Sequence, residues 1–314
     1  MTLLLQYTLI FASVLMLVAL GGCFAERSGV INIGLEGIMV IGALGGALVM
    51  KFLPVSLGAP VMVITTVLVS ALFGLLFSLL LAVAAINFKA DQTITGTAMN
   101  MLATAGATVA VKAMNTAASG GNDVSSDIAY THSKDLFIVR LGEFEFNWFM
   151  LVAVICLAVS FVALYKTKFG LRLRACGEHP QAADSVGINV YKMRYAGVLI
   201  SGLLGGLGGI VYITAGVSVW KFENGVAGFG FLAMAVMIFG GWHPLKIALA
   251  SLLFGFFRAL GNVYSGFDFM LALNIPSVVY NMLPYIISLV VLAFTSKKSQ
   301  GPKASGVPYD KGTR

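Results

Sequence analysis

Long apolar runs alternate with short polar segments along nearly the whole chain. Each run can cross the hydrocarbon core of a bilayer, about 30 Å thick, as an α-helix. The pattern therefore predicts an all-α, polytopic transmembrane helix bundle of about nine spans. A re-entrant or split helix at the second or third span would change the number to eight or ten. The predicted spans are residues 3–22, 30–50, 59–86, 92–112, 147–165, 194–214, 228–243, 246–262 and 277–295.

Composition favours the same class. Of the 314 residues 59% are hydrophobic and only 11% are charged, whereas soluble domains carry about 25% charged residues. The net charge of +7 does not indicate a nucleic-acid surface, because the basic residues are scattered and lie beside apolar segments. That distribution is typical of the cytoplasmic loops of membrane proteins.

Lysine and arginine also predict the orientation. Placing the basic segment 166–193 in the cytoplasm puts most of the 20 basic residues on that side, as membrane proteins prefer. The N-terminus is then outside and the C-terminus is cytoplasmic. Residues 1–296 form the predicted transmembrane domain, with an external loop at 113–146 and a cytoplasmic loop at 166–193. Residues 297–314 are short and polar, so they are expected to form a disordered cytoplasmic tail.

The cytoplasmic loop carries its own structural signals. Pro180 suits the first turn of a helix, and Gly187 suits the position after its last residue. The residues between them, QAADSV (181–186), include helix-forming small residues. We therefore expect a short surface helix at about 180–186, presented to the cytoplasm, although a passive linker remains the alternative.

Four stretches of the chain together resemble one family. They read ERSGVINIGLEGIMVIGA (26–43), ITGTAMNMLA (94–103), FGLRLRACGEHPQAADSVGINVYKMRY (169–195) and GFGFLAMAVMIFGGWHP (228–244). In this order and spacing they are similar to the permeases of ABC importers for simple sugars, branched-chain amino acids and nucleosides. The nucleoside branch, which works with basic membrane lipoproteins, is the most similar. The resemblance covers about residues 20–295.

The resemblance implies how such a chain would be driven. The alanine pair and following glycine of the cytoplasmic loop resemble the family's coupling helix, which fits a cleft on the ATP-binding subunit. Gln181 departs from the family, many members of which carry an acid there. The implied partners are that subunit with its ATP and Mg²⁺, a second permease subunit and an extracytoplasmic substrate-binding lipoprotein. The implied coupling residues are Glu178, Pro180, Gln181, Ala182, Ala183, Asp184 and Gly187.

The residues themselves give no sign of a motor or an enzyme. No GxxxxGK[ST] phosphate-binding loop occurs, so force would have to arrive through a cytoplasmic contact. The chain has only three histidines and three cysteines, with no spacing typical of a catalytic set or a metal site. We therefore expect a non-enzymatic subunit that holds no cofactor or metal of its own.

Polar residues inside predicted spans are candidates for a solute pathway, because a polar group in hydrocarbon is costly and faces the bundle or water. Neutral hydroxyl and amide groups suit the hydroxyls and base edges of a nucleoside. Each of them could equally hold helices together, and for Glu36 the two interpretations are evenly balanced. The candidates are Asn32, Glu36, Thr93, Thr97, Asn100, Asn262 and Asn281.

The sequence thus predicts the permease subunit of an ATP-driven nucleoside importer in the bacterial cytoplasmic membrane. A simple sugar or a branched-chain amino acid is an alternative solute. An ion-coupled secondary carrier is the alternative mechanism, but it needs intramembrane charges and Glu36 stands alone.

Overall fold

The computed structural model describes residues 2–130, 133, 135–142, 144–215, 218–266, 276–295 and 301–312. Most of them are helical, and seven helices are long and apolar enough to cross a membrane. This set indicates an integral membrane protein, in agreement with the predicted class. The seven are α1 (Thr2–Ser28), α2 (Leu35–Phe52), α3 (Ala59–Ala82, continued to Asn87 by a π-helical turn), α4 (Gln92–Ala118), α6 (Trp148–Lys166), α9 (Val190–Thr214) and α11 (Pro244–Val263).

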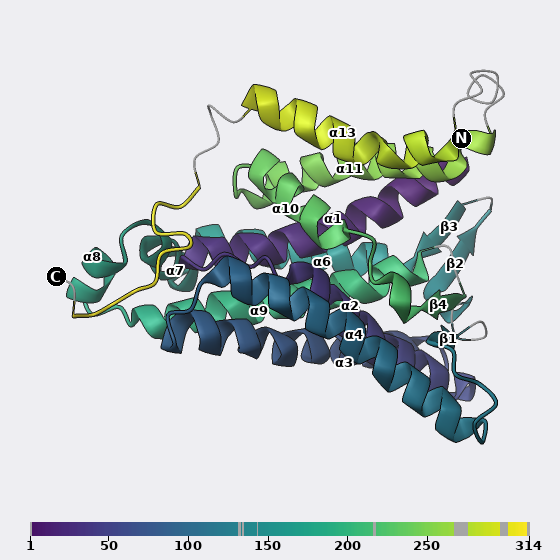
Figure 1. Ribbon diagram of the computed structural model, residues 1–314. Coiled ribbons are helices and arrows are strands. Elements are labelled where there is room, and N and C mark those ends of the chain that lie inside the picture. The colour runs from purple at the N-terminus through teal and green to yellow at the C-terminus, as the bar shows by residue number, and fades with distance from the viewer. Residues whose placement is uncertain are drawn as a thin grey trace.

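The two ends of the bundle differ in structure (Figure 1). At one end lie the short helices α7 (Lys168–Glu178) and α8 (Pro180–Ser185), with the C-terminal segment beside them. At the other end β1 (Asp127–Ala129) pairs antiparallel with β4 (Val219–Lys221), and β2 (Ile138–Leu141) pairs with β3 (Phe144–Asn147). The expected all-α pattern is thus incomplete, since two small sheets form in the loops.

The predicted span at 228–243 is wrong as a continuous helix. α10 (Phe229–Phe239) has 11 residues, or about 16 Å at 1.5 Å per residue, which is half of a bilayer core. Ala227 and Gly228, just before it, have positive φ angles of 51° and 80°, so the chain turns there and cannot continue a helix upstream. The segment predicted at 277–295 is helical as α13 (Ser277–Thr295), with Pro284 inside it.

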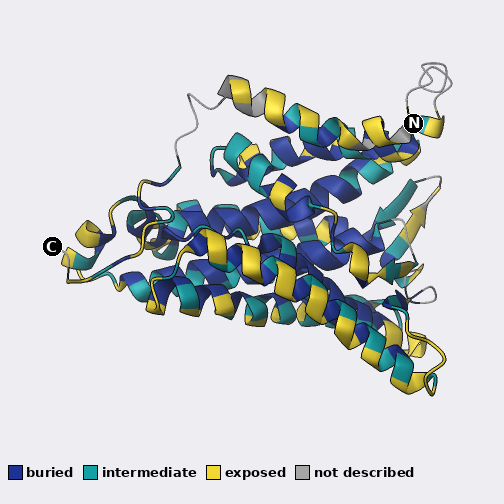
Figure 2. Ribbon diagram, viewed as in Figure 1, coloured by how far each residue is buried: buried dark blue, intermediate teal, exposed yellow. Residues whose placement is uncertain are grey.

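α1 and α9 form the centre of the bundle and are buried along most of their length, whereas α3 and α4 expose one side (Figure 2). Glycines let α9 approach its neighbours closely. A Cβ on Gly206 would collide with the backbone of α3 at Ser70 and Gly74, and one on Gly209 with the backbone of Met39 in α2. Small residues at helix contacts are typical of packing in lipid.

Candidate functional site

Two interrupted helices meet inside the bundle. α1 ends at Ser28 and α2 begins at Leu35, with irregular backbone between them, while α10 begins after the turn at Gly228. Glu36 lies in the first turn of α2, and its carboxylate accepts hydrogen bonds from the backbone N–H groups of Gly228 and Gly230, each at 2.7 Å. Glu36 therefore caps the start of α10 from another helix.

This cap answers a physical problem. The first N–H groups of a helix have no partner within the helix, and hydrocarbon offers them none. A carboxylate satisfies two of these donors, and its charge also complements the positive end of the helix dipole. The contact is close, since a Cβ on Gly230 would lie 2.5 Å from the Glu36 nitrogen. These contacts favour the structural one of the two roles that the sequence leaves open for Glu36.

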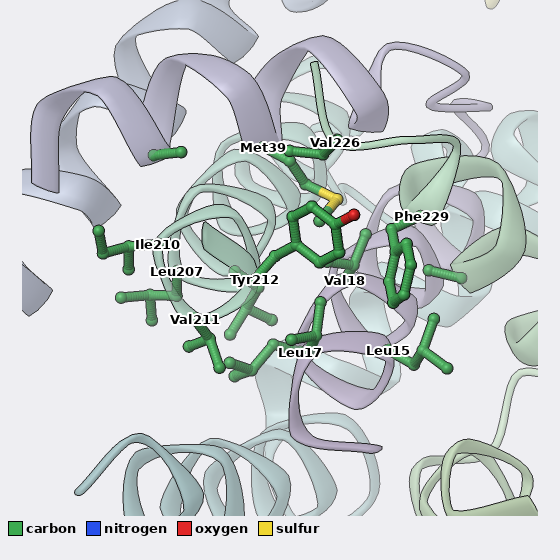
Figure 3. Close-up of a cluster of buried hydrophobic side chains, with 14 of the residues drawn as sticks. Leu15, Leu17, Val18, Met39, Leu207, Ile210, Val211, Tyr212, Val226 and Phe229 are labelled. Carbon is green, nitrogen blue, oxygen red and sulfur yellow. The ribbon is translucent and has the colours of Figure 1, made fainter. Parts of the chain in front are cut away.

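Aromatic rings and a cation surround the start of α10. The Phe229 ring lies 4.4 Å from that of Tyr212, and the Arg258 guanidinium lies over Phe229 at 5.3 Å. Figure 3 shows the Tyr212 and Phe229 rings side by side among aliphatic side chains of the core. The Tyr285 hydroxyl donates to the Ala227 carbonyl at 2.8 Å. Neither tyrosine is among the residues that the sequence predicts for the site, although a tyrosine within an apolar span is a signal of a polar contact.

Asn100 and Asn32 stabilise the irregular segment 29–34. Asn100 Oδ1 accepts from the backbone N–H of Gly37 at 2.8 Å, and its Nδ2 donates to the Ile33 carbonyl at 3.0 Å. Asn32 is 2% exposed and donates to Ser201 Oγ in α9 at 2.8 Å. These amides supply the hydrogen bonds that a broken helix lacks at membrane depth.

Three of the other predicted pathway residues lie elsewhere. Thr93 and Thr97 are on the exposed side of α4, where the Thr97 hydroxyl donates to the Thr93 carbonyl one turn back. Asn262 is exposed near the end of α11. Asn281 is part of α13, but its side chain is outside the described part of the chain. Of the six candidates whose side chains the structure describes, it brings together Asn32, Glu36 and Asn100.

Residues 222–228, called the descending segment below, connect β4 to the start of α10 and lie beside α4. They form a 3₁₀ turn (Phe222–Asn224) followed by further turns. Near the strands, Glu223 Oε1 pairs with Lys112 Nζ of α4 at 2.6 Å. Further along, Gly225 approaches Thr104 of α4, and Gly228 then reaches Glu36. A non-helical stretch followed by a half-helix is the arrangement that transporters use to line a site near mid-membrane.

At the opposite end, α7 and α8 form a compact knob. Pro180 occupies the first turn of α8, and Gly187 follows its end with a φ of 84°. The Ile188 N–H donates to the Ala183 carbonyl at 3.0 Å, as expected for a glycine-terminated helix. The short helix thus forms where the sequence predicts it.

The predicted coupling residues divide into an exposed and a buried set. Gln181, Ala182 and Gly187 are exposed, and the neighbouring Val186 is 75% exposed. Pro180 and Ala183 are buried, with Ala183 packing in a small cluster beside Cys176, Val190 and Tyr309. An exposed apolar tip on a rigid base suits insertion into another protein.

Ionic contacts tie the knob to the bundle. Glu178 Oε1 lies 3.7 Å from Arg27 at the end of α1, and a Cβ on Gly177 would collide with the Arg27 carbonyl. Asp184 Oδ1 lies 3.9 Å from Lys311 Nζ.

Burial raises the pKa of the Cys176 thiol to about 11, against a smaller lowering effect of Arg194. This thiol is therefore protonated at neutral pH. Among the described residues, no three His, Cys, Asp or Glu side chains group as metal ligands do.

Comparisons with known proteins agree along nearly the full length. Residues 4–294 match the family described as "Branched-chain amino acid transport system / permease component". The chain is 43% identical to the guanosine ABC transporter permease protein NupQ of Bacillus subtilis (strain 168), over 98% of this chain and 96% of that protein. It is 40% identical to the nucleoside ABC transporter permease protein NupC of Lactococcus lactis subsp. cremoris (strain MG1363), over 96% and 95% of the two chains.

A more distant relative comes from the same Bacillus strain as the first. The guanosine ABC transporter permease protein NupP is 25% identical, over 85% of this chain and 75% of its own. No solved structure matches the chain.

Proposed function

Because the chain belongs to the family of permease components of branched-chain amino acid transport systems, we propose that it is the membrane subunit of an ATP-driven nucleoside importer. The observation that carries the proposal is the exposed, glycine-terminated α8 on a chain with two full-length relatives named as nucleoside or guanosine permeases. The cell membrane of a bacterium is its expected location.

The proposed topology keeps nine crossings but changes the seventh. With the N-terminus outside, α1, α2, α3, α4, α6 and α9 alternate in direction and end on the strand-bearing side. The seventh crossing combines the irregular segment at 223–228 with the half-helix α10. α11 then returns outward and α13 leads inward, which leaves the C-terminus and the α7–α8 knob in the cytoplasm.

In the proposed mechanism, the ATP-binding subunit holds ATP and Mg²⁺ and receives α8 in a cleft. The side chains that enter the cleft are the exposed Gln181, Ala182 and Val186. The buried Pro180 and Ala183 hold the opposite side of α8 against the rest of the chain. Movement of that subunit on ATP binding is passed to α7 and, through Glu178 and Arg27, to α1.

α4 is the proposed wall of the solute pathway. Of the seven long helices it is the least apolar, yet much of its surface is exposed in the single chain. Such a surface is better suited to a wet pathway or a second permease subunit than to lipid. Thr93 and Thr97 lie on its exposed side and Thr104 faces the descending segment. These hydroxyls suit the neutral, hydroxyl-rich sugar of a nucleoside.

The partner permease is proposed to be a different chain. Bacillus subtilis has two permeases named for guanosine, one 43% and one 25% identical to this chain. That pattern favours a heterodimer of related permeases, supplied by a substrate-binding lipoprotein outside the membrane.

An ion-coupled carrier is less well supported by the geometry. Such a carrier needs an acid or a base that exchanges ions along the pathway. Both carboxylate oxygens of Glu36 are instead bonded to the backbone of α10.

Solute competition tests the proposed substrate. The chain is reconstituted in proteoliposomes with its ATP-binding subunit, partner permease and lipoprotein, and uptake of radiolabelled guanosine is measured. An excess of unlabelled uridine or adenosine is expected to reduce uptake, whereas ribose and leucine leave it unchanged. Competition by ribose or leucine alone would assign the importer to another solute.

A further inference from the structure

The C-terminal segment 301–312, drawn as the yellow trace in Figure 1, packs along the end of the bundle that carries α7 and α8. This differs from the disordered tail that its composition predicts. Besides local turns, the segment has backbone hydrogen bonds and ion pairs with residues far away in the sequence, and one of its aromatic rings is buried. Residues 301–312 are called the strap below.

The strap forms part of the seat of α8. Tyr309 is 4% exposed and packs in the same cluster as Ala183 of α8 and Cys176 of α7. The backbone N–H of Ala304 donates to the Gly177 carbonyl at 2.8 Å, and Lys311 lies beside Asp184 of α8. Removing the strap would expose the face of α8 that Ala183 buries.

Arg194 of α9 is buried against the strap. It is 1% exposed, and its Nη1 donates to the Val307 carbonyl at 2.9 Å. Its guanidinium lies 5.9 Å from the Tyr309 ring centre. Burying an arginine is unfavourable unless it is paired and hydrogen-bonded, and its Nε and Nη2 have no partner among the described residues. The strap carbonyl is thus a main compensation for this buried cation.

The strap also reaches the interrupted segments of the bundle. The Gly306 N–H donates to the Gly29 carbonyl at 3.3 Å, at the break between α1 and α2. Gly301 lies against the Trp242 ring in the turn between α10 and α11. Asp310 pairs with Lys89, between α3 and α4, at 2.8 Å.

We propose that the strap is a positioning segment of the coupling apparatus, which holds α8 in a fixed relation to the α1–α2 break and the α10–α11 turn. The inference rests on the proposed function. A contiguous set of contacts leads from α8 through Tyr309, Arg194 and Gly306 to Gly29. Only six residues lie between Gly29, which the strap contacts, and Glu36, which caps α10. Displacement of α8 is thereby transmitted to the half-helix.

The test compares two truncations in the complete reconstituted complex. One chain ends at residue 300 and lacks the strap, and the control lacks only Thr313 and Arg314. The quantity measured is solute transported per ATP hydrolysed. Loss of the strap is expected to lower this ratio at least about fivefold, the lower end of couplings between sites, while ATP hydrolysis continues. An unchanged ratio would overturn the proposal.

Point variants cover the case in which the truncated chain does not assemble. Tyr309→Ala removes the ring beneath α8, whereas Tyr309→Phe keeps it as the matched control. The same fall in transport per ATP is expected for the alanine variant only. Equal ratios in the two variants would contradict the proposed positioning role of the strap.

Hydrogen exchange separates this inference from the proposed function. In the purified full-length chain, the backbone amides at 181–188 are expected to exchange more slowly than in Tyr309→Ala. This comparison needs no transport. If the full-length complex transports nothing, the importer hypothesis fails. The exchange result still decides whether the strap holds α8 in place. Equal exchange in both chains would show that Tyr309 does not hold α8.

Discussion

The Glu36 carboxylate of α2 and the Gly230 backbone N–H of α10 are joined by a 2.7 Å hydrogen bond across 194 positions of sequence. A second bond from Gly228 binds the other carboxylate oxygen. An acid that the sequence presents as an isolated intramembrane charge therefore fixes the start of a half-helix. The arrangement predicts that the side chain contributes to stability as well as to transport.

Replacing Glu36 by alanine is expected to destabilise the protein strongly. Two backbone donors lose their acceptor, and each unsatisfied buried group costs about 1–3 kcal/mol. Glu36→Gln keeps one carbonyl acceptor and should lie between alanine and the native protein. The melting temperature in detergent checks this order. An alanine variant that melts like the native protein would show that the cap is dispensable.

Glycine packing of α9 predicts a sharp contrast between two substitutions. Gly206→Ala places a Cβ against the backbone of α3, so the helices must separate, and the yield of folded, monodisperse protein should fall severely. Gly106→Ala meets no atom within 4 Å and should be neutral or slightly stabilising, since alanine favours a helix by about 1 kcal/mol over glycine. Size-exclusion profiles of the two variants provide the measurement. Similar profiles would refute the close contact of α9 and α3.

Thiol labelling tests the proposed orientation. Gln181→Cys creates an exposed thiol on α8, which a membrane-impermeant maleimide should label in inside-out vesicles but not in intact cells. The native Cys176 is an internal control. It is buried and its pKa is raised to about 11, so the reactive thiolate is scarce below that pH and labelling at pH 7–8 should be absent. Labelling of Gln181→Cys in intact cells would reverse the topology.

The Lys89–Asp310 pair predicts how the strap responds to pH. The hydrogen bond from Lys89 lowers the pKa of Asp310, so the pair stabilises strap docking above the ordinary aspartate pKa of about 3.9. This contribution is lost as the pH falls through the lower pKa of the docked state. Proteolysis of the strap at pH 7 and at pH 3.5, with an acid-active protease at the lower pH and Asp310→Asn as the control, measures the effect. The native chain should be more resistant than Asp310→Asn at pH 7, and the difference between the two chains should narrow in acid as Asp310 is protonated. A native strap equally resistant at both pH values would rule out this role of the pair.

The features predicted well from the sequence are those set by local pattern. Seven long helices follow from their apolar runs, and α8 follows from Pro180 and Gly187. α10 could not be predicted as a half-helix, because the apolar run gives no sign that a turn with positive φ at Ala227 precedes it. Composition predicts a disordered tail at 297–314 and, for a similar reason, gives no sign of the contacts that residues 301–312 make as the strap. The strap's contacts with Arg194 and Gly29 depend on tertiary structure, which composition does not record.

For the candidate site, residue type predicted Asn32, Glu36 and Asn100 as important but not what they bind. Their partners are mostly backbone groups of broken segments, and only the fold reveals where a helix is interrupted. Thr93 and Thr97 share a helix face as their spacing suggests, yet whether that face meets solute depends on a partner chain.

The most direct measurement is ATP-dependent accumulation of radiolabelled guanosine by the complete complex, made with the native chain, with Ala182→Arg and with Asn122→Arg. Both positions are exposed, one on α8 and one at the strand-bearing end, so both variants should insert and fold. The account predicts uptake with the native chain and Asn122→Arg, and loss of both uptake and ATP-binding subunit with Ala182→Arg. Native-level uptake by Ala182→Arg, or uptake by the native chain without ATP, would contradict it.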